Sequence, residues 1–219
     1  MDSKSRQVKP GRRYDSQGRR RQALRTRQAI LDAAQRLFLA DGYAATTVSA
    51  IAAAGGVSVE TVYKAFGGKA GLVRGIRDRA LAGEGPVHAE DRSEQMRLAE
   101  SDPAVIIAKW AGFTTEIMPQ ASPVLLLISA GAAASPDMAA LREEMDRDRR
   151  VRMAHNARFL HQAGHLDPGV TADQATDVMW LYSSPELYEL LVLRRGWPLE
   201  RYGKFIAEAM IAALLPRLS

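Results

Sequence analysis

The stretch that decides the fold is TVSAIAAAGGVSVETVYKAF, residues 47–66. Apolar residues recur at spacings of three and four on both sides of Gly55-Gly56, which predicts two short helices joined by a glycine turn. Val57 is expected to fill the angle between them, and Val62 and Phe66 give the second helix a buried side. These are the features of a helix-turn-helix, which places the end of a helix in the major groove of DNA.

Hydroxyl residues mark the start of both helices. Thr47 and Ser58 each stand where an N-cap side chain accepts a hydrogen bond from a backbone N–H group. An ordinary helical hairpin in an all-helical core would give the same pattern. The basic segment that precedes the stretch, and Lys69 directly after it, favour DNA binding.

Charge is distributed unevenly along the 219 residues. Residues 1–80 carry 16 Lys and Arg against 6 Asp and Glu, a net charge of +10, whereas residues 81–219 carry 14 against 19, a net charge of −5. A basic N-terminal part on an acidic body indicates that a polyanion is bound at one end.

Composition narrows the class of protein. Hydrophobic residues make up 47% of the chain, which is typical of a globular protein, and no cysteine is present. Disulfides and thiolate metal sites are therefore excluded. The charged N-terminus is not a signal peptide, and the longest apolar run is too short to span a membrane. We expect a cytoplasmic protein without a membrane partner.

The run GYAATTVSAIAAAGGVSVETVYKAFGGKAGL, residues 42–72, closely resembles the DNA-binding domain of the TetR family of transcriptional regulators. The resemblance covers roughly residues 20–80. Two positions depart from it: Gly55 replaces the usual alanine, and Ala65 stands where an aromatic residue or histidine is frequent. The resemblance implies a homodimeric regulator whose last two long helices form the dimer interface. It also implies that the helix after the helix-turn-helix links the DNA-binding domain to the rest of the protein.

These observations predict an all-α fold, with an N-terminal three-helix domain that contains the helix-turn-helix and a C-terminal helical bundle that dimerises. The expected parts are a flexible basic arm over residues 1–21, a DNA-binding domain over residues 22–82, and a ligand-binding and dimerisation domain over residues 83–219. The first helix of the DNA-binding domain is expected over residues 22–40.

In the body, Met118-Pro119 is expected to end one helix and Ser122-Pro123 to begin another. A charge-dense helix over residues 136–163 is expected to expose its ion pairs to solvent. Helices over residues 171–193, kinked by Pro185, and 198–215 carry more apolar surface than one chain can cover. They are therefore predicted to form half of a homodimer interface within residues 171–215, with a monomeric bundle as the alternative.

The predicted DNA contacts divide by role. The second helix of the helix-turn-helix, residues 58–64, is the expected reading helix, and its N-terminal half should face bases. Its outer side, its flanks and the basic arm should hold phosphates. The residues expected at bases are Val59, Glu60 and Thr61, on a helix capped by Ser58. The residues expected at phosphates are Arg19, Arg20, Arg21, Arg25, Thr47, Tyr63, Lys64 and Lys69.

A pocket for an unidentified small-molecule effector is expected between the helices of residues 102–182. The candidate residues are the apolar Trp110, Phe113, Met118, Phe159 and Trp180 and the polar Glu116 and His155, although core packing or solvent exposure would explain each of them.

No nucleotide-binding loop, catalytic motif or convergent set of acid and base groups is found, so neither a cofactor nor enzymatic activity is expected. His161 and His165 stand four residues apart, but Gly164 interrupts the segment, and surface histidines are favoured over a metal site. The predicted function is that of a sequence-specific transcriptional regulator. It is expected to be a ligand-responsive repressor that binds double-stranded DNA at a near-palindromic operator as a dimer. A non-specific DNA-compaction protein and a small helical enzyme are the alternatives.

Overall fold

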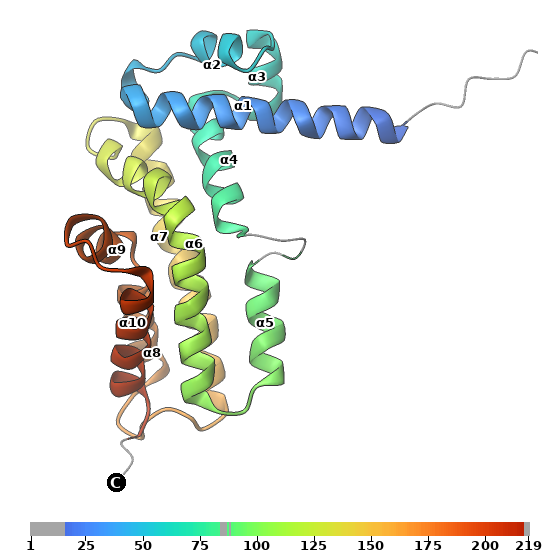
Figure 1. Ribbon diagram of the computed structural model, residues 1–219. Helices are drawn as coiled ribbons and strands as arrows, with labels where there is room; N and C mark the ends of the chain where they lie inside the picture. The colour runs from blue at the N-terminus through green and yellow to red at the C-terminus, as the bar shows by residue number, and fades with distance from the viewer. Residues whose placement is uncertain (1–15, 84–86, 88, 217–219) are drawn as a thin grey trace, which may run out of the picture.

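The computed structural model describes residues 16–83, 87 and 89–216. These residues contain helices and no strand, which confirms the all-α prediction. Figure 1 shows α1 to α3 gathered at one end of the molecule, with α4 running from them to the long helices of the body. The elements are α1 Ser16–Ala45, α2 Val48–Ala54, α3 Val59–Phe66, α4 Lys69–Leu81, α5 Ala89–Ala99, α6 Pro103–Gly131, α7 Pro136–Gln162, α8 Ala172–Tyr182, α9 Pro185–Tyr188, the π-helical turn η1 Glu189–Arg194, and α10 Leu199–Leu214.

Helix α1 begins earlier than predicted. It starts at Ser16, so the end of the segment expected to be a flexible arm, residues 16–21, is helical. The remainder of that arm, residues 1–15, lies outside the described residues. The regular part of α1 ends at Gly42, whose φ of 81° is the left-handed conformation that glycine adopts without steric cost. Buried Thr46 closes this end, because its hydroxyl donates to the Gly42 carbonyl oxygen at 2.8 Å.

The two short helices form from local signals. The hydroxyl of Thr47 accepts a hydrogen bond from the Ala50 N–H group, and that of Ser58 accepts one from the Thr61 N–H group, each at 3.1 Å. Gly56 turns the chain with a φ of 65°. The helices are held in place by burial of one apolar face against α1 and α4. The fully buried side chains of this small core include Ile30, Phe38, Ile51, Val62 and Leu72.

Helix α4 leaves the helix-turn-helix at a close contact. A Cβ atom on Gly71 would lie 1.7 Å from the carbonyl oxygen of Phe66, so only glycine allows α4 to start this near the end of α3. The buried side of α4, which includes Leu72 and Ile76, packs between α1 and α6. The start of α4 is therefore fixed to the helix-turn-helix, and its remainder is packed on the body.

Two predictions about proline were wrong. Pro119 and Pro123 lie inside one continuous helix, α6, rather than between two helices. Neither proline can donate a backbone hydrogen bond, but α6 packs against α4, α7 and α10, and this packing offsets the loss. Pro185 has a stronger effect than the predicted kink. Helix α8 ends at Tyr182 with Ser183 as its C-cap, and Ser184 caps a separate helix α9 whose first residue is Pro185.

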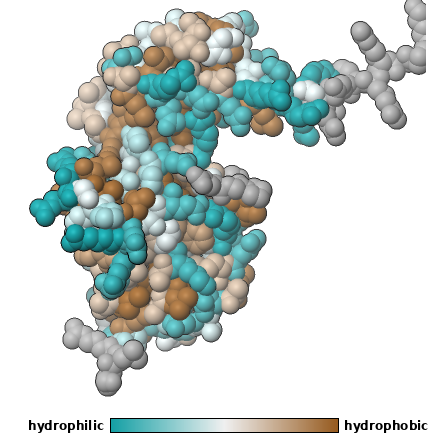
Figure 2. All heavy atoms as spheres, in the orientation of Figure 1, coloured by the Kyte–Doolittle hydropathy of each residue, from teal (hydrophilic) through white to brown (hydrophobic). Residues whose placement is uncertain are grey.

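In the body, α6 and α7 form the centre, and α8 and α10 pack against them. Not all of the apolar surface of these elements is covered within the chain. Figure 2 shows hydrophobic patches over the region of α9 and α10. Within the described part of the chain, no helix is sufficiently long and apolar to cross a membrane.

Candidate nucleic-acid interface and effector cavity

Helix α3 presents a polar outer face. Val62 is fully buried on its inner side, whereas 39% of Val59 and 53% of Tyr63 are exposed. Glu60 and Lys64 are exposed as well, and Thr61 is half-buried. The Thr61 hydroxyl lies 2.8 Å from the hydroxyl of Ser58, so it is already hydrogen-bonded to the N-cap residue of α3. The exposed face of α3 therefore combines an apolar group, an acid, a phenol and a base.

An arginine fixes the other end of α3. Arg27 donates from Nη1 to the Ala65 carbonyl oxygen at 3.2 Å, and its guanidinium lies 4.3 Å from the centre of the Phe66 ring. Arg27 therefore joins α1 to the C-terminal end of α3. A cation at the C-terminal end of a helix also interacts favourably with the helix dipole.

Four arginines line the projecting N-terminal part of α1. Arg19, Arg20, Arg21 and Arg25 are exposed, and Figure 2 shows a largely hydrophilic surface on this part of α1. All four stand on α1, the helix whose later part packs against α2.

Lys69 begins α4 beside the turn that follows α3. Its Nζ atom donates to the Ala44 carbonyl oxygen at 3.3 Å and lies 4.4 Å from the centre of the Tyr43 ring. The hydroxyl of Tyr43 in turn donates to Asp137, the second residue of α7, at 3.4 Å. The predicted phosphate ligand is thus half-buried and positioned by residues that also touch the body.

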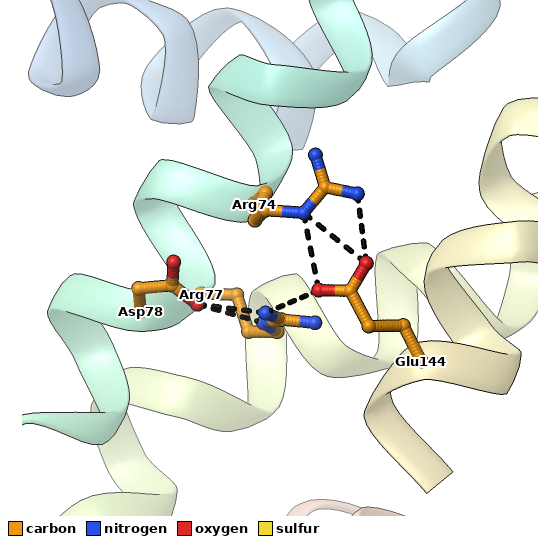
Figure 3. A network of polar contacts seen from close by, with 4 residues as sticks. All are labelled: Arg74, Arg77, Asp78 and Glu144. Carbon is orange, nitrogen blue, oxygen red and sulfur yellow. Dashed lines mark hydrogen bonds and ion pairs between the residues drawn. The ribbon is translucent and has the colours of Figure 1, made fainter. Parts of the chain in front are cut away.

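The far end of α4 is joined to α7 by a network of ion pairs (Figure 3). Glu144 of α7 accepts from Nη2 of Arg74 at 2.7 Å and from Nη2 of Arg77 at 2.8 Å. The same Nη2 atom of Arg77 donates to Asp78 at 2.8 Å. Hydrogen bonds from Arg74 and Arg77 lower the pKa of Glu144 to about 2, so this carboxylate is ionised at neutral pH.

Most charges in the middle of α7 face solvent as predicted, and Glu143, Arg147, Asp148, Arg150 and Arg152 are exposed. Some of the charges also contact α8. Arg150 pairs with Asp173 and Asp177 of α8, and Arg149 donates to the Trp180 carbonyl oxygen and stacks on its ring. Ion pairs also form within α7, where Asp146 pairs with Arg142 and Arg149. The charges of α7 therefore both pair within the helix and join it to α4 and α8.

A cavity of about 770 Å³ lies in the body, within the range of pockets that hold drug-sized molecules. Its walls come from α4, α5, α6, α7, α8 and α10. Three of the predicted pocket residues, Trp110, Phe113 and Met118, line it.

The other four predicted residues lie outside this lining because they are engaged elsewhere. Glu116 pairs with Arg92 of α5, and His155 lies 3.2 Å from Glu94 of α5. Phe159 and Trp180 lie under the guanidinium groups of Arg97 and Arg149.

Sequence reasoning missed two basic residues of the cavity wall. Arg77 and Arg149 both line it, and their side chains are only 7% and 15% exposed. No pattern in the sequence marks them, because each is buried by helices distant along the chain. Among the described residues, no group of three acidic or histidine side chains gathers in a way that could hold a metal ion.

Comparison with known proteins finds a sequence match over the N-terminal part of the chain. The family model described as "Bacterial regulatory proteins, tetR family" matches residues 30–76. The chain is 35% identical over 79 residues to the HTH-type transcriptional repressor ComR of Escherichia coli (strain K12). This match spans 34% of the chain and only 38% of that relative.

Solved structures match over nearly the whole chain. The native form of NalD, the secondary repressor of the MexAB-OprM multidrug efflux pump in Pseudomonas aeruginosa, superposes with a TM-score of 0.71 at 19% identity, covering 90% of this chain and 100% of NalD. A complex of SmeT with triclosan gives a TM-score of 0.68 at 21% identity, covering 87% and 92%. SmeT is the repressor of the SmeDEF efflux pump of Stenotrophomonas maltophilia. At these identities the likeness concerns the fold.

Proposed function

Since the chain belongs to the TetR family of bacterial regulatory proteins, whose members bind DNA and are not enzymes, we propose that it is a sequence-specific transcriptional repressor. It binds a near-palindromic operator as a homodimer and releases it when a small molecule occupies the cavity. The DNA-binding domain comprises α1 to α4, near residues 22–82, and the effector-binding and dimerisation domain comprises residues 83–219.

The observation that carries this proposal is the outer face of α3. Val59, Glu60 and Tyr63 are exposed on a helix whose inner face is fully buried. A rigid helix with exposed groups at its N-terminal half is suited to contact base edges in the major groove. The arginines at residues 19–21 and Arg25 stand on α1, which continues into this domain, and supply the phosphate contacts that give affinity and orientation.

Exposed apolar residues support a dimer. Leu181 of α8, Leu190 and Leu193 of η1, and Phe205 of α10 are 56%, 52%, 55% and 36% exposed. Large apolar side chains gathered on adjacent elements favour association with a second copy. A two-fold dimer would place the two α3 helices about 34–36 Å apart, one turn of DNA.

Helix α4 supplies a physical route from the cavity to DNA. Lys69 at its start contacts the DNA-binding end, and Arg77 near its other end lines the cavity and pairs with Glu144. A ligand that moves Arg77 therefore moves the helix that sets the position of α3. The SmeT complex with triclosan supports a small-molecule effector for this chain too.

Selection of bound duplexes from a random pool, at physiological salt, tests the proposal. We expect enrichment of one sequence with two inverted half-sites. A non-specific compaction protein would retain duplexes without enrichment, and a helical enzyme would retain none.

A further inference from the structure

The effector cavity has mostly apolar walls. The apolar part of the lining includes three aromatic residues and five methionines, which suits a ligand with a hydrophobic body. The lining includes Trp110, Phe113, Met118, Met145, Tyr182 and Met210.

Three hydrogen-bonding atoms of the lining are buried without a partner. They are Nη1 of Arg77, Nε1 of Trp110 and Nε of Arg149, and none has a hydrogen-bond partner among the described residues. All three are donors, and no side-chain acceptor of the lining is buried and unpartnered in the same way among these residues. Figure 3 shows the remaining terminal nitrogen of Arg77 directed away from Asp78. Because buried donors without a partner are unfavourable, a molecule in the cavity should supply a hydrogen-bond acceptor to them.

The basic and acidic side chains of the lining differ in how deeply they are buried. The side chains of Arg77 and Arg149 are 7% and 15% exposed, whereas that of Asp78 is 57% exposed and already held by Arg77. The other acidic lining residues, Asp91 and Asp148, are exposed, as is Arg152. The buried charged side chains of the lining are therefore the two arginines, and each is paired with a carboxylate outside the lining, Glu144 for Arg77 and Asp146 for Arg149.

We propose that the cavity selects an apolar, drug-sized molecule carrying one carboxylate. Nη1 of Arg77 binds the carboxylate, and the Trp110 indole N–H and Arg149 Nε are the further donors available to it. A carboxylate satisfies these donors through charge-assisted hydrogen bonds. The inference rests on the proposed function, in which this cavity holds the effector, and names the chemical class of that effector.

The same contact explains how such a ligand acts on α4. Arg77 holds Asp78 and Glu144 through Nε and Nη2, so a carboxylate on Nη1 shares the guanidinium with the carboxylate that joins α4 to α7. Binding of an anion at Nη1 should therefore perturb the ion pair between Arg77 and Glu144, which holds α4 against α7.

Isothermal titration calorimetry of the full chain without DNA tests the proposal. The probes are biphenyl-4-carboxylate, biphenyl-4-methanol and biphenyl-4-methylamine, which share one hydrophobic body and differ in charge. We expect the carboxylate to bind at least about tenfold more tightly than the alcohol, and the amine most weakly, as expected for a charge-assisted hydrogen bond.

Variants assign this preference to residues. Trp110→Phe keeps the aromatic wall and removes one donor, and should weaken the carboxylate about threefold to tenfold with little effect on the alcohol. Arg77→Met should remove the preference. Arg158→Met, on the exposed side of α7 outside the lining, is the matched control and should change nothing.

Equal binding of the three probes, a preference for the amine, or no binding of any probe at millimolar concentration would overturn the proposal. So would an Arg77→Met protein that is folded by circular dichroism and retains the full preference. Because no titration contains DNA, a failure here leaves operator binding to be judged independently.

Discussion

Glu144 of α7 accepts hydrogen bonds from both Arg74 and Arg77 of α4, so one carboxylate joins the helix behind the DNA-binding end to the C-terminal body. Arg77 is buried, and its charge is balanced by Glu144 and Asp78. The link between the two parts of the chain is thus an ion-pair network, which a ligand can rearrange, in addition to apolar packing.

Glu144→Gln should weaken this link. The amide keeps the shape but loses the charge that compensates Arg77, so we expect the free energy of unfolding to fall by roughly 1–3 kcal/mol. Chemical unfolding followed by circular dichroism measures the change. Glu143→Gln, at the exposed neighbouring position, is the matched control, and an equal effect of both variants would remove the special role of Glu144.

The pH dependence of the unfolding free energy should reflect the ionisation of the Glu144 carboxylate. Its pKa is lowered from 4.5 to about 2 in the folded protein, so its contribution is fully present above about pH 5 and is lost as the pH falls from 4.5 toward 2. The difference in unfolding free energy between the wild type and Glu144→Gln should therefore be constant from pH 7 to 5 and shrink below that. A difference that stays constant down to pH 3 would show that Glu144 is not held as the structure places it.

Lys69→Ala should weaken binding to every DNA sequence by a similar factor. Loss of one phosphate contact should lower the slope of log affinity against log salt by roughly one. Glu60→Gln, on the exposed face of α3, should instead change the preference at a single base pair, since a carboxylate reads the amino group of cytosine. Competition binding over a series of salt concentrations distinguishes the two, and a sequence-selective loss for Lys69→Ala would contradict its phosphate role.

Leu190→Glu should convert the protein to a monomer. The residue is 52% exposed on η1, and burying a carboxylate in an apolar interface is strongly unfavourable. Light scattering at micromolar concentration should give half the mass of the wild type. Leu98→Glu changes a more exposed leucine on α5, outside residues 171–215, and should leave the mass unchanged. If both variants keep the mass of the wild type, the dimer does not form through η1.

The helix-turn-helix was predictable because its signals are local. The caps Thr47 and Ser58, the turn at Gly56 and the buried Val62 all act within a few residues of their own position. The all-helical class followed from the same periodicity along the rest of the chain.

What could not be predicted depends on contacts between distant segments. Pro119 and Pro123 are strong local signals for a helix end, but packing of α6 on its neighbours overrides them. For the candidate site, the apolar residues Trp110, Phe113 and Met118 were found because large apolar side chains gather in a body core. The buried arginines of the cavity were missed, since their burial is decided by helices that the sequence does not place.

The most direct test of the central claim is a titration of the selected operator with the purified chain, reading both mass and affinity of the complex. The account predicts two chains on each duplex and a preference of about 1,000-fold or more over a scrambled duplex of equal composition at physiological salt. One chain per duplex with equal affinity for both sequences would contradict it.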